Sequence, residues 1–325
     1  MSGVFEDYSD LADIEEQLRS ADAGTRRVAI MELAHLGDPS AVPLLASMLD
    51  DQDAGVRQQV ARALGEYDGL AAAGALAKAL VDADPLVQQA AADSAAELKD
   101  SAAAPPLLDL VEHPVAFVRM SSLRALKELR CQDALKAALQ ALQDTDAGVR
   151  VQAVGVIGFL KLEVAIPAIR AAATDSDANV RRAAVSALAF SSTQPAAEAI
   201  RAGLADTEWL VREVAAETLG RITLGTKAAP DLIAALDDPY WRVRLKATRS
   251  LGRMRIHAAV EPIAKGLGHI EANLRKEAAG ALGEVGDAAA LPFLRAVTED
   301  TDPEVRKNAR WAICEIEEKA LALRG

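Results

Sequence analysis

The stretch DDQDAGVRQQVARALG, residues 50–65, contains the pattern from which the fold is predicted. Its Val56, Val60 and Leu64 follow one another at intervals of four, which places them on one stripe of an α-helix. An arginine, preceded mostly by valine, recurs along the chain at 31 residues or a multiple, with a single interval of 32. These arginines are Arg26, Arg57, Arg119, Arg150, Arg181, Arg212, Arg244, Arg275 and Arg306. Gln88, preceded by Val87, stands midway between Arg57 and Arg119 and completes a set of ten anchors.

Two further sets of residues, here called columns, recur at fixed offsets from the anchors. Three residues after each anchor the chain has a small residue: Ala29, Val60, Ala91, Ser122, Ala153, Ala184, Ala215, Ala247, Ala278 and Ala309. Seven residues after it stand Leu33, Leu64, Ala95, Leu126, Ile157, Leu188, Leu219, Leu251, Leu282 and Ile313. The small column lets neighbouring helices approach closely, and the larger column fills the seam between them.

A second apolar helix is predicted in each repeat, as in residues 40–51 and 228–238. Proline stands near its start, where the first helical turn tolerates a missing N–H: Pro43, Pro105, Pro167, Pro230, Pro262 and Pro292. Glycines end two of the anchor helices, at Gly37 and Gly286. Aspartates four residues before their anchors are predicted N-caps: Asp53, Asp84, Asp146, Asp177 and Asp302.

This pattern resembles HEAT repeats, specifically the short type first associated with phycobilisome lyases. The signature D-x-D-x-x-V-R-x-x-A-x-x-A-L-G is nearly literal in residues 50–65 and in TEDTDPEVRKNARWAI, residues 298–313. The resemblance implies an all-α, right-handed α-solenoid of about ten helix pairs over residues 20–325. Residues 1–19 form an N-terminal segment whose residues 8–19 are a capping helix, and residues 307–323 cap the other end.

Composition narrows the classes of function. The net charge of −12 disfavours general binding of nucleic acid, because phosphate contacts dominate that affinity. Cys131 and Cys314 form no CxxC pair or disulfide framework, which fits a reducing compartment. The acidic first ten residues do not resemble a signal peptide, and no apolar run is long enough to span a bilayer. We expect a cytoplasmic protein that requires no membrane.

The sequence predicts no catalytic, cofactor-binding or metal site. The arginine column is interpreted as structural, each arginine pairing with a capping aspartate of its own or a neighbouring repeat. The four histidines, His35, His113, His257 and His269, are dispersed and lack metal-site spacing. Cys314 occupies a slot where other repeats have glycine, and we expect a buried packing thiol there. GRITLGTK, residues 220–227, lacks P-loop spacing and holds the one-residue insertion, so it is predicted to be a longer turn.

A partner is expected at positions that the repeat leaves free. The resemblance implies that the anchor helices line the concave face of a superhelix. In the first three repeats this face is predicted to be mixed and polar. In repeats 4 to 6 the free positions include an apolar floor with flanking arginines: Phe117, Met120, Arg124, Phe159, Arg182 and Phe190.

Repeats 7 to 9 are basic and aromatic at their free positions. Residues 238–277 contain nine basic and four acidic residues, a local charge of +5 in an acidic chain. The predicted partner-binding residues here are Trp209, Arg221, Tyr240, Trp241, Arg242, Lys246, Arg249 and Arg253. Because tryptophan, tyrosine and arginine are enriched in binding hot spots, this interval is the favoured partner surface.

The predicted function is therefore a non-catalytic scaffold or adaptor that takes the acidic segment of a protein partner in its groove. One alternative, implied by the resemblance alone, is a bilin-lyase-like or chaperone-type factor acting on a chromophore- or cofactor-bearing protein. Another is nucleic-acid binding, which the net charge disfavours.

Overall fold

The computed structural model describes the backbone of residues 11–322 and the side chains of residues 13–320. Within residues 11–322 every regular element is a helix and no strand occurs. The chain divides into two compact units, Met1–Leu160 and Lys161–Gly325. None of the helices in the described part of the chain combines the length and apolar character that crossing a bilayer requires.

The anchor arginines lie on the first helix of each repeat, as predicted. In the first unit these helices are α2 (Ala23–His35), α4 (Ala54–Ala63), α6 (Pro85–Ala95), α8 (Ala116–Leu129) and α10 (Ala147–Leu160). In the second unit they are α12 (Ala178–Ala187), α14 (Trp209–Leu219), α16 (Trp241–Arg253), α18 (Ala272–Val285) and α20 (Pro303–Ala322).

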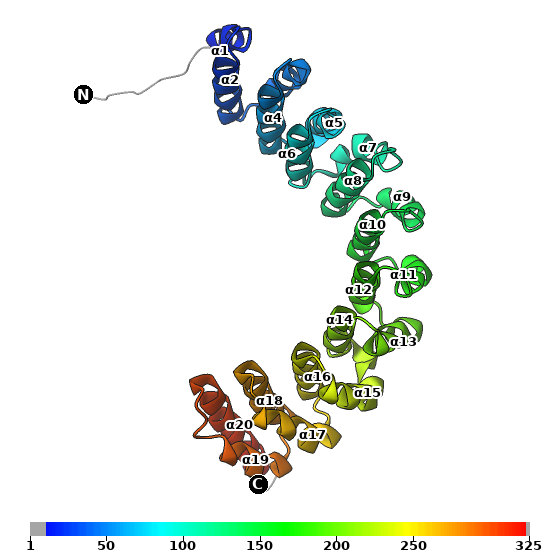
Figure 1. Cartoon of the computed structure of the whole chain (residues 1–325), viewed down its shortest axis with the longest axis vertical. Helices are drawn as coiled ribbons and strands as arrows, with labels where there is room; N and C mark the ends of the chain where they lie inside the picture. The colour runs from blue at the N-terminus through cyan, green and yellow to red at the C-terminus, as the bar shows by residue number, and fades with distance from the viewer. Residues whose placement is uncertain (1–10, 323–325) are drawn as a thin grey trace, which may run out of the picture. The chain divides into compact units, whose positions relative to one another are not determined.

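In the repeats that have both helices among the described residues, the second helix is shorter than the first except in the second repeat, and it is usually flanked by 3₁₀ turns. The first unit has α3 (Val42–Ser47), α5 (Gly69–Leu80), α7 (Ala104–Leu108) and α9 (Ala134–Ala141). The second unit has α11 (Ile166–Ala172), α13 (Gln194–Ala202), α15 (Ala229–Ala234), α17 (Val260–Lys265) and α19 (Leu291–Ala296). Within each unit the first helices lie along one side and the second helices along the other (Figure 1).

A helix lies at each end of the described residues. Helix α1 (Leu11–Leu18) packs against α2, and residues 8–10 of the predicted capping helix lie outside the described part. Helix α20 packs against α18 and α19, and no second helix follows it up to residue 322. The first ten residues, where no signal peptide is expected, and residue 323 also lie outside the described part.

The predicted columns form the core. All ten residues of the small column are fully buried, and the larger column is buried from Leu33 to Leu282. Predicted N-caps are confirmed: Asp53, for example, accepts from the Val56 N–H at 3.0 Å. Gly286 ends α18 in the left-handed conformation at φ 76°. The inserted residue lies in a six-residue 3₁₀ helix, η8 (Thr223–Ala228), so residues 220–227 form a longer turn and no phosphate loop.

The Cys314 side chain is exposed, so the prediction of a buried thiol at this position is wrong. In the earlier repeats the equivalent glycine faces the first helix of the following repeat, as Gly252 faces Ala281 of α18. Among the described residues no further first helix packs on this slot of α20. The slot is a packing position only where another repeat follows.

Gly252 and Gly280 give a test of this close packing. A Cβ on Gly252 would lie 2.8 Å from the Ala281 Cα, whereas one on Gly280 would meet the Asn308 Nδ2 at an ordinary 3.5 Å. We expect Gly252→Ala to lower the free energy of unfolding by about 1–3 kcal/mol, because α16 and α18 must separate. Gly280→Ala should raise it by about 0.5–1 kcal/mol through helix propensity. Urea unfolding monitored by circular dichroism measures both, and a gain in stability in both variants would contradict the close approach.

Candidate functional site

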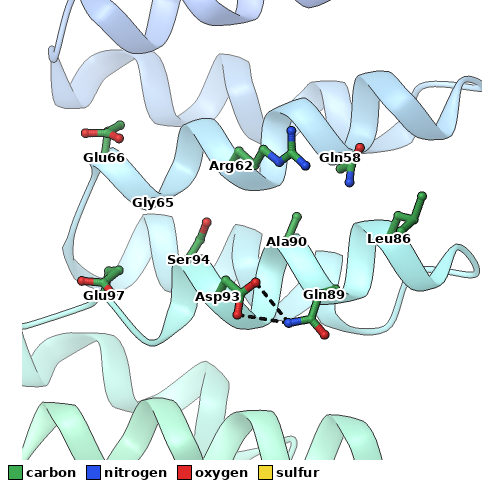
Figure 2. A pocket seen from close by; sticks show the side chains of 10 residues that line it. All are labelled: Gln58, Arg62, Gly65, Glu66, Leu86, Gln89, Ala90, Asp93, Ser94 and Glu97. Atoms are coloured by element: carbon green, nitrogen blue, oxygen red, sulfur yellow. Dashed lines mark hydrogen bonds between the residues drawn. The ribbon is translucent and has the colours of Figure 1, made fainter.

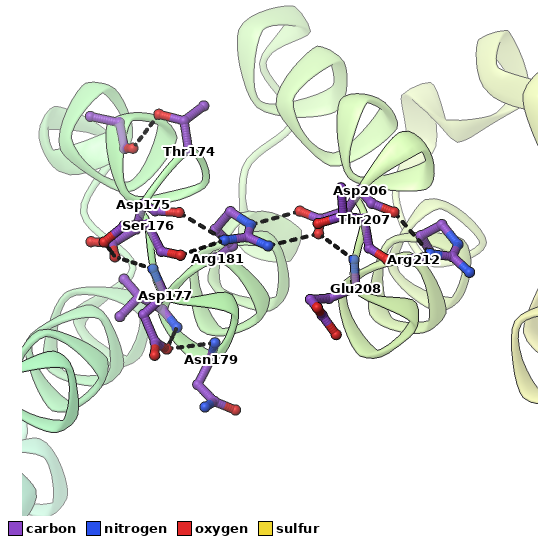
Figure 3. A network of polar contacts seen from close by, with 12 residues as sticks. Thr174, Asp175, Ser176, Asp177, Asn179, Arg181, Asp206, Thr207, Glu208 and Arg212 are labelled. Carbon is purple, nitrogen blue, oxygen red and sulfur yellow. Dashed lines mark hydrogen bonds and ion pairs between the residues drawn. The ribbon is translucent and has the colours of Figure 1, made fainter.

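The arginine column forms a ladder of ion pairs between consecutive repeats. Each paired arginine donates from Nε and Nη2 to an aspartate about 25 residues later, with Nε–Oδ distances between 2.6 and 2.9 Å. The pairs are Arg26–Asp51, Arg57–Asp82, Arg119–Asp144, Arg181–Asp206, Arg212–Asp238 and Arg275–Asp300. The arginine Nη1 also donates to carbonyl oxygens at the start of its own helix, such as Asp175 O at 2.9 Å (Figure 3). The ladder is structural, as the sequence indicates.

The identity of the pairing aspartate differs from the prediction. Arg26 pairs with Asp51, whereas the capping residue of the next helix is Asp53. The capping carboxylate is already engaged by the backbone N–H groups of the helix that it caps. The aspartate two residues earlier faces the preceding repeat, and its side chain also accepts from the N–H of the capping residue, at 2.8 Å from Asp53 N.

These ion pairs stabilise the charged form of the aspartates. Hydrogen bonding to Arg57, Arg119, Arg181 and Arg275 lowers the pKa of Asp82, Asp144, Asp206 and Asp300, respectively, below the ordinary value. Partial burial of each carboxylate opposes this effect but is the smaller contribution. The ladder therefore stays ionised at neutral pH.

The first unit holds a polar groove between α4 and α6, about 470 Å³ in volume (Figure 2). Arg62, Glu66, Asp93 and Glu97 are the charged residues of its lining, and Gln89 donates to Asp93 at 3.1 Å. Three carboxylates against one guanidinium make the groove acidic. The lining agrees with the mixed polar surface predicted for the first three repeats.

The predicted apolar floor of repeats 4 to 6 is not continuous within the first unit. Phe117 is the second residue of α8, whereas Phe159 lies near the end of α10, with the Arg130 guanidinium 5.0 Å from its ring centre. Their positions differ by eleven residues relative to the anchors, or about 16 Å along a helix. Met120 lies against Gly148, and Arg124 is exposed at 3.4 Å from Asp93.

The remaining two members of the predicted floor belong to the second unit. Arg182 is exposed on α12, and Phe190 is half-buried at the end of the 3₁₀ helix η6 (Leu188–Phe190). Phe190 stands nine residues after its anchor, the same position that Phe159 holds in the first unit.

An aromatic–arginine cluster, comprising Trp209, Tyr240, Trp241 and Arg242, joins the N-terminal ends of α14 and α16. The Trp209 and Tyr240 rings stack with centroids 5.3 Å apart and an interplanar angle of 11°. The Arg242 guanidinium lies 5.7 Å from the Trp209 ring centre and 5.8 Å from that of Trp241. Tyr240 remains 48% exposed, and Arg242 is exposed. These mutual contacts hold the rings in place while leaving a face open.

Ion pairs between repeats occupy several of the other predicted basic residues. Lys246 lies 2.7 Å from Glu217, which also pairs with Arg221. Arg249 donates from Nε and Nη2 to both oxygens of Glu277, at 2.8 and 2.6 Å. Two carboxylates, Glu217 and Glu277, therefore offset part of the positive charge of Lys246, Arg249 and Arg221. Positive charge remains exposed at Arg242 and Arg253.

Arg253 borders a terminal groove, about 320 Å³ in volume, between α16, α18 and α20. Its charged and aromatic lining comprises Arg253, Arg255, Glu284, Trp311, Glu315 and Lys319. Trp311 is 44% exposed, and burial raises the pKa of Glu284, with the charge of Glu277 contributing next. Sequence reasoning missed Trp311, although its place five residues after the anchor Arg306 is a free position in the tenth repeat.

Metal-ligating side chains do not gather in the described chain. No group of three or more histidine, cysteine, aspartate or glutamate side chains capable of holding a metal ion occurs among the described residues. His257 contacts Asp287 at 2.9 Å, and His269 contacts Arg244.

Comparison of the whole fold gives neighbours among solved solenoid structures. A chain of the Kap95–Nup1 complex matches with a TM-score of 0.65 and 13% identity, over 95% of this chain and 50% of that chain. A chain from a Kap95 complex with RanGDP gives 0.58 and 18%, over 94% and 50%. The Escherichia coli protein YibA gives 0.61 and 20%, over 82% and 97%. At these identities the likeness concerns the fold alone, and the chain spans about half of the Kap95-type neighbours.

The sequence comparisons identify the repeat. No curated protein matches the chain significantly by sequence. The HEAT repeats family matches it in overlapping segments, at residues 11–83, 73–147, 118–189, 135–220, 171–251 and 229–314. Together with the paired helices and the interlocking ladder, this coverage shows that the chain belongs to the HEAT-repeat family.

Proposed function

We propose that the protein is a non-catalytic scaffold or adaptor that binds a protein partner. The binding surface is the first-helix face, which we define as the exposed sides of α14, α16, α18 and α20. The observation that carries the proposal is the aromatic–arginine cluster, which presents stacked, partly exposed rings beside an exposed guanidinium. Such rings bind a partner with little further loss of side-chain freedom, because their own contacts already orient them.

The charges of this face favour an acidic segment of the partner. Arg242 is bound only through aromatic ring faces in the contacts described, and Arg253 borders the terminal groove. Glu284 and Glu315 share the terminal groove with Arg253, whereas the contacts given for Arg242 are with aromatic rings. A carboxylate of the partner would therefore pair most directly with Arg242. The separated cysteines fit a reducing compartment, and the proposal places the scaffold in the cytoplasm.

The double variant Arg242→Glu with Arg253→Glu tests this surface. We expect it to weaken partner binding by about 30-fold or more, because two hot-spot contacts become repulsive. The measurement is quantitative affinity capture with mass spectrometry, followed by titration of the partner so identified. Circular dichroism and the melting temperature should stay close to those of the wild type, since neither arginine belongs to the ladder.

A control of equal charge change is available on the second helices. Arg170 on α11 and Lys265 on α17 are both exposed, and Arg170→Glu with Lys265→Glu leaves the first-helix face unaltered. The control should retain binding. Equal capture of the partner by the wild type and the Arg242/Arg253 variant would refute the proposed surface. Equal loss of binding in both double variants would show that binding depends on net charge and not on this surface.

A second candidate is a bilin-lyase-like or chaperone-type factor of the short repeat class. The observation in its favour is that Arg242 lies over two tryptophan rings, which suits a flat, conjugated ligand carrying propionates. An absorbance titration with an open-chain tetrapyrrole tests it, and Trp241→Ala should abolish any spectral change. Nucleic-acid binding is less favoured, because Lys246 and Arg249 are already compensated by carboxylates.

A further inference from the structure

One step of the second unit's ladder lacks its aspartate. Arg244 of α16 faces His269 at the position where Arg181 faces Asp206 and Arg275 faces Asp300. Its Nη1 donates to Asp238 O at 3.0 Å, so the guanidinium is held as in the other repeats. Its Nη2 lies 2.6 Å from His269 Nε2, while its Nε is buried and has no hydrogen-bond partner.

His269 cannot satisfy the donors that surround it. Its Nδ1 accepts from the Glu271 N–H at 3.0 Å, the role that Asp206 Oδ1 has toward Glu208 N at 2.8 Å. A neutral imidazole has one acceptor nitrogen, whereas a carboxylate accepts at both oxygens. Burial, followed by the charge of Arg244, lowers the pKa of His269 and so favours the neutral ring. Three donors, namely Arg244 Nε, Arg244 Nη2 and the Glu271 N–H, therefore share a single acceptor.

The first unit shows how the same substitution is accommodated elsewhere. His113 also stands in the aspartate position, and its Nδ1 accepts from the Val115 N–H at 3.2 Å. The anchor 25 residues before it is Gln88, a neutral side chain that donates to Asp82 O at 2.7 Å. At that step Gln88 and His113 stand in the arginine and aspartate positions, so no guanidinium is left without a carboxylate. At Arg244 the arginine is present, and a histidine stands where the other steps have the accepting carboxylate.

The surroundings of this step are open to a protein chain. Gly268, just before His269, has nothing within 4 Å of the place where a Cβ would stand. Ile270, just after it, is 90% exposed, and Tyr240 of the aromatic–arginine cluster is 48% exposed. An acidic side chain of a partner could thus reach the guanidinium once the His269 ring turns toward solvent, with apolar contacts at Ile270 and Tyr240.

We propose that Arg244 is a binding site for a carboxylate side chain of the protein partner, which completes the ladder in place of the missing aspartate. The identity of the bound group, a carboxylate of a protein partner, rests on the proposed function. The site itself can be tested without the partner, so failure of one proposal does not imply failure of the other.

The test compares the wild type with His269→Asp and His269→Ala. The probe is sodium acetate, titrated at constant ionic strength against sodium chloride, and the readout is the NMR signal of Arg244 Nε–Hε, assigned by its loss in Arg244→Lys. We expect a saturable shift in the wild type and tighter binding in His269→Ala, where no ring has to move. In His269→Asp an internal carboxylate occupies the site, so acetate should cause no shift.

Thermal unfolding gives an independent readout. His269→Asp should melt at a higher temperature than the wild type, and acetate should raise the melting temperature of His269→Ala more than chloride does. An acetylated peptide amide with one aspartate beside leucine should shift the Arg244 signal, whereas its asparagine counterpart should not. Identical acetate responses in the three proteins, or a response to inorganic phosphate but not to acetate or the peptide, would overturn the proposal.

Discussion

Replacing Arg181 with alanine is expected to lower the free energy of unfolding by about 3 kcal/mol, the lower end of the range for breaking a buried ion pair. The Arg181 and Asp206 side chains are only 15% and 11% exposed, and two hydrogen bonds of 2.7 and 2.8 Å join them. The same guanidinium donates to Asp175 O and Ser176 O, so one side chain joins two repeats and the start of its own helix. Removing it leaves Asp206 charged and largely buried.

A matched control exists on the second helices. Arg201 also donates from Nε and Nη2 to an aspartate of the next repeat, Asp231, but these side chains are 52% and 34% exposed. Solvent already stabilises such charges, so Arg201→Ala should cost less than about 1 kcal/mol. Urea unfolding of both variants measures the difference. A double-mutant cycle with Arg181→Ala and Asp206→Ala isolates the interaction energy of the ladder pair. Equal losses at the two sites would show that burial of the ladder contributes nothing.

Acidification is expected to unfold the protein steeply once the pH falls below about 4, the ordinary range of an aspartate. Hydrogen bonds from the anchor arginines lower the pKa of Asp82, Asp144, Asp206 and Asp300 in the folded state. The stabilisation from each pair is therefore complete above the unfolded pKa and is lost as the pH falls through the folded value. Each unit of difference in pKa contributes about 1.4 kcal/mol, and the same event recurs along the array.

The measurement is helical circular dichroism between pH 7 and 2 at constant ionic strength, with urea titrations at several pH values. Asp206→Asn supplies the control, because it removes one titrating pair. Its stability should be lower at neutral pH and should depend less on pH than that of the wild type. A stability that stays constant from pH 7 to pH 3 would contradict a role for the ladder carboxylates. Because repeat arrays are stabilised mainly by neighbouring contacts, the units can lose structure in separate steps.

The repeat could be predicted from the amino-acid order, because the spacing of residues within one helix is local information. The intervals within one helix place Val56, Val60 and Leu64 on one stripe, and the same arithmetic predicted the buried columns that the structure confirms. Caps such as Asp53 and Gly286 were predictable for the same reason, since a cap acts on the helix beside it in sequence. Because the pattern recurs every 31 residues, each repeat supports the assignment of helices in the others.

Which side chains meet across repeats could not be predicted, because it depends on how the repeats pack. The pairing of Lys246 with Glu217 and of Arg249 with Glu277 depends on the rotation and offset of adjacent helices, which no interval within a helix specifies. The choice of Asp51 over Asp53 as the partner of Arg26 has the same origin.

The candidate site follows from these contacts between repeats. Tyr240 could be predicted as a free aromatic residue, but its stacking on Trp209 of the preceding repeat could not. The missing acceptor at Arg244 is visible only when His269, 25 residues later, is seen opposite it. Helical periodicity thus fixes which face a residue occupies, whereas the packing of one repeat on the next fixes its partner and the charge left exposed.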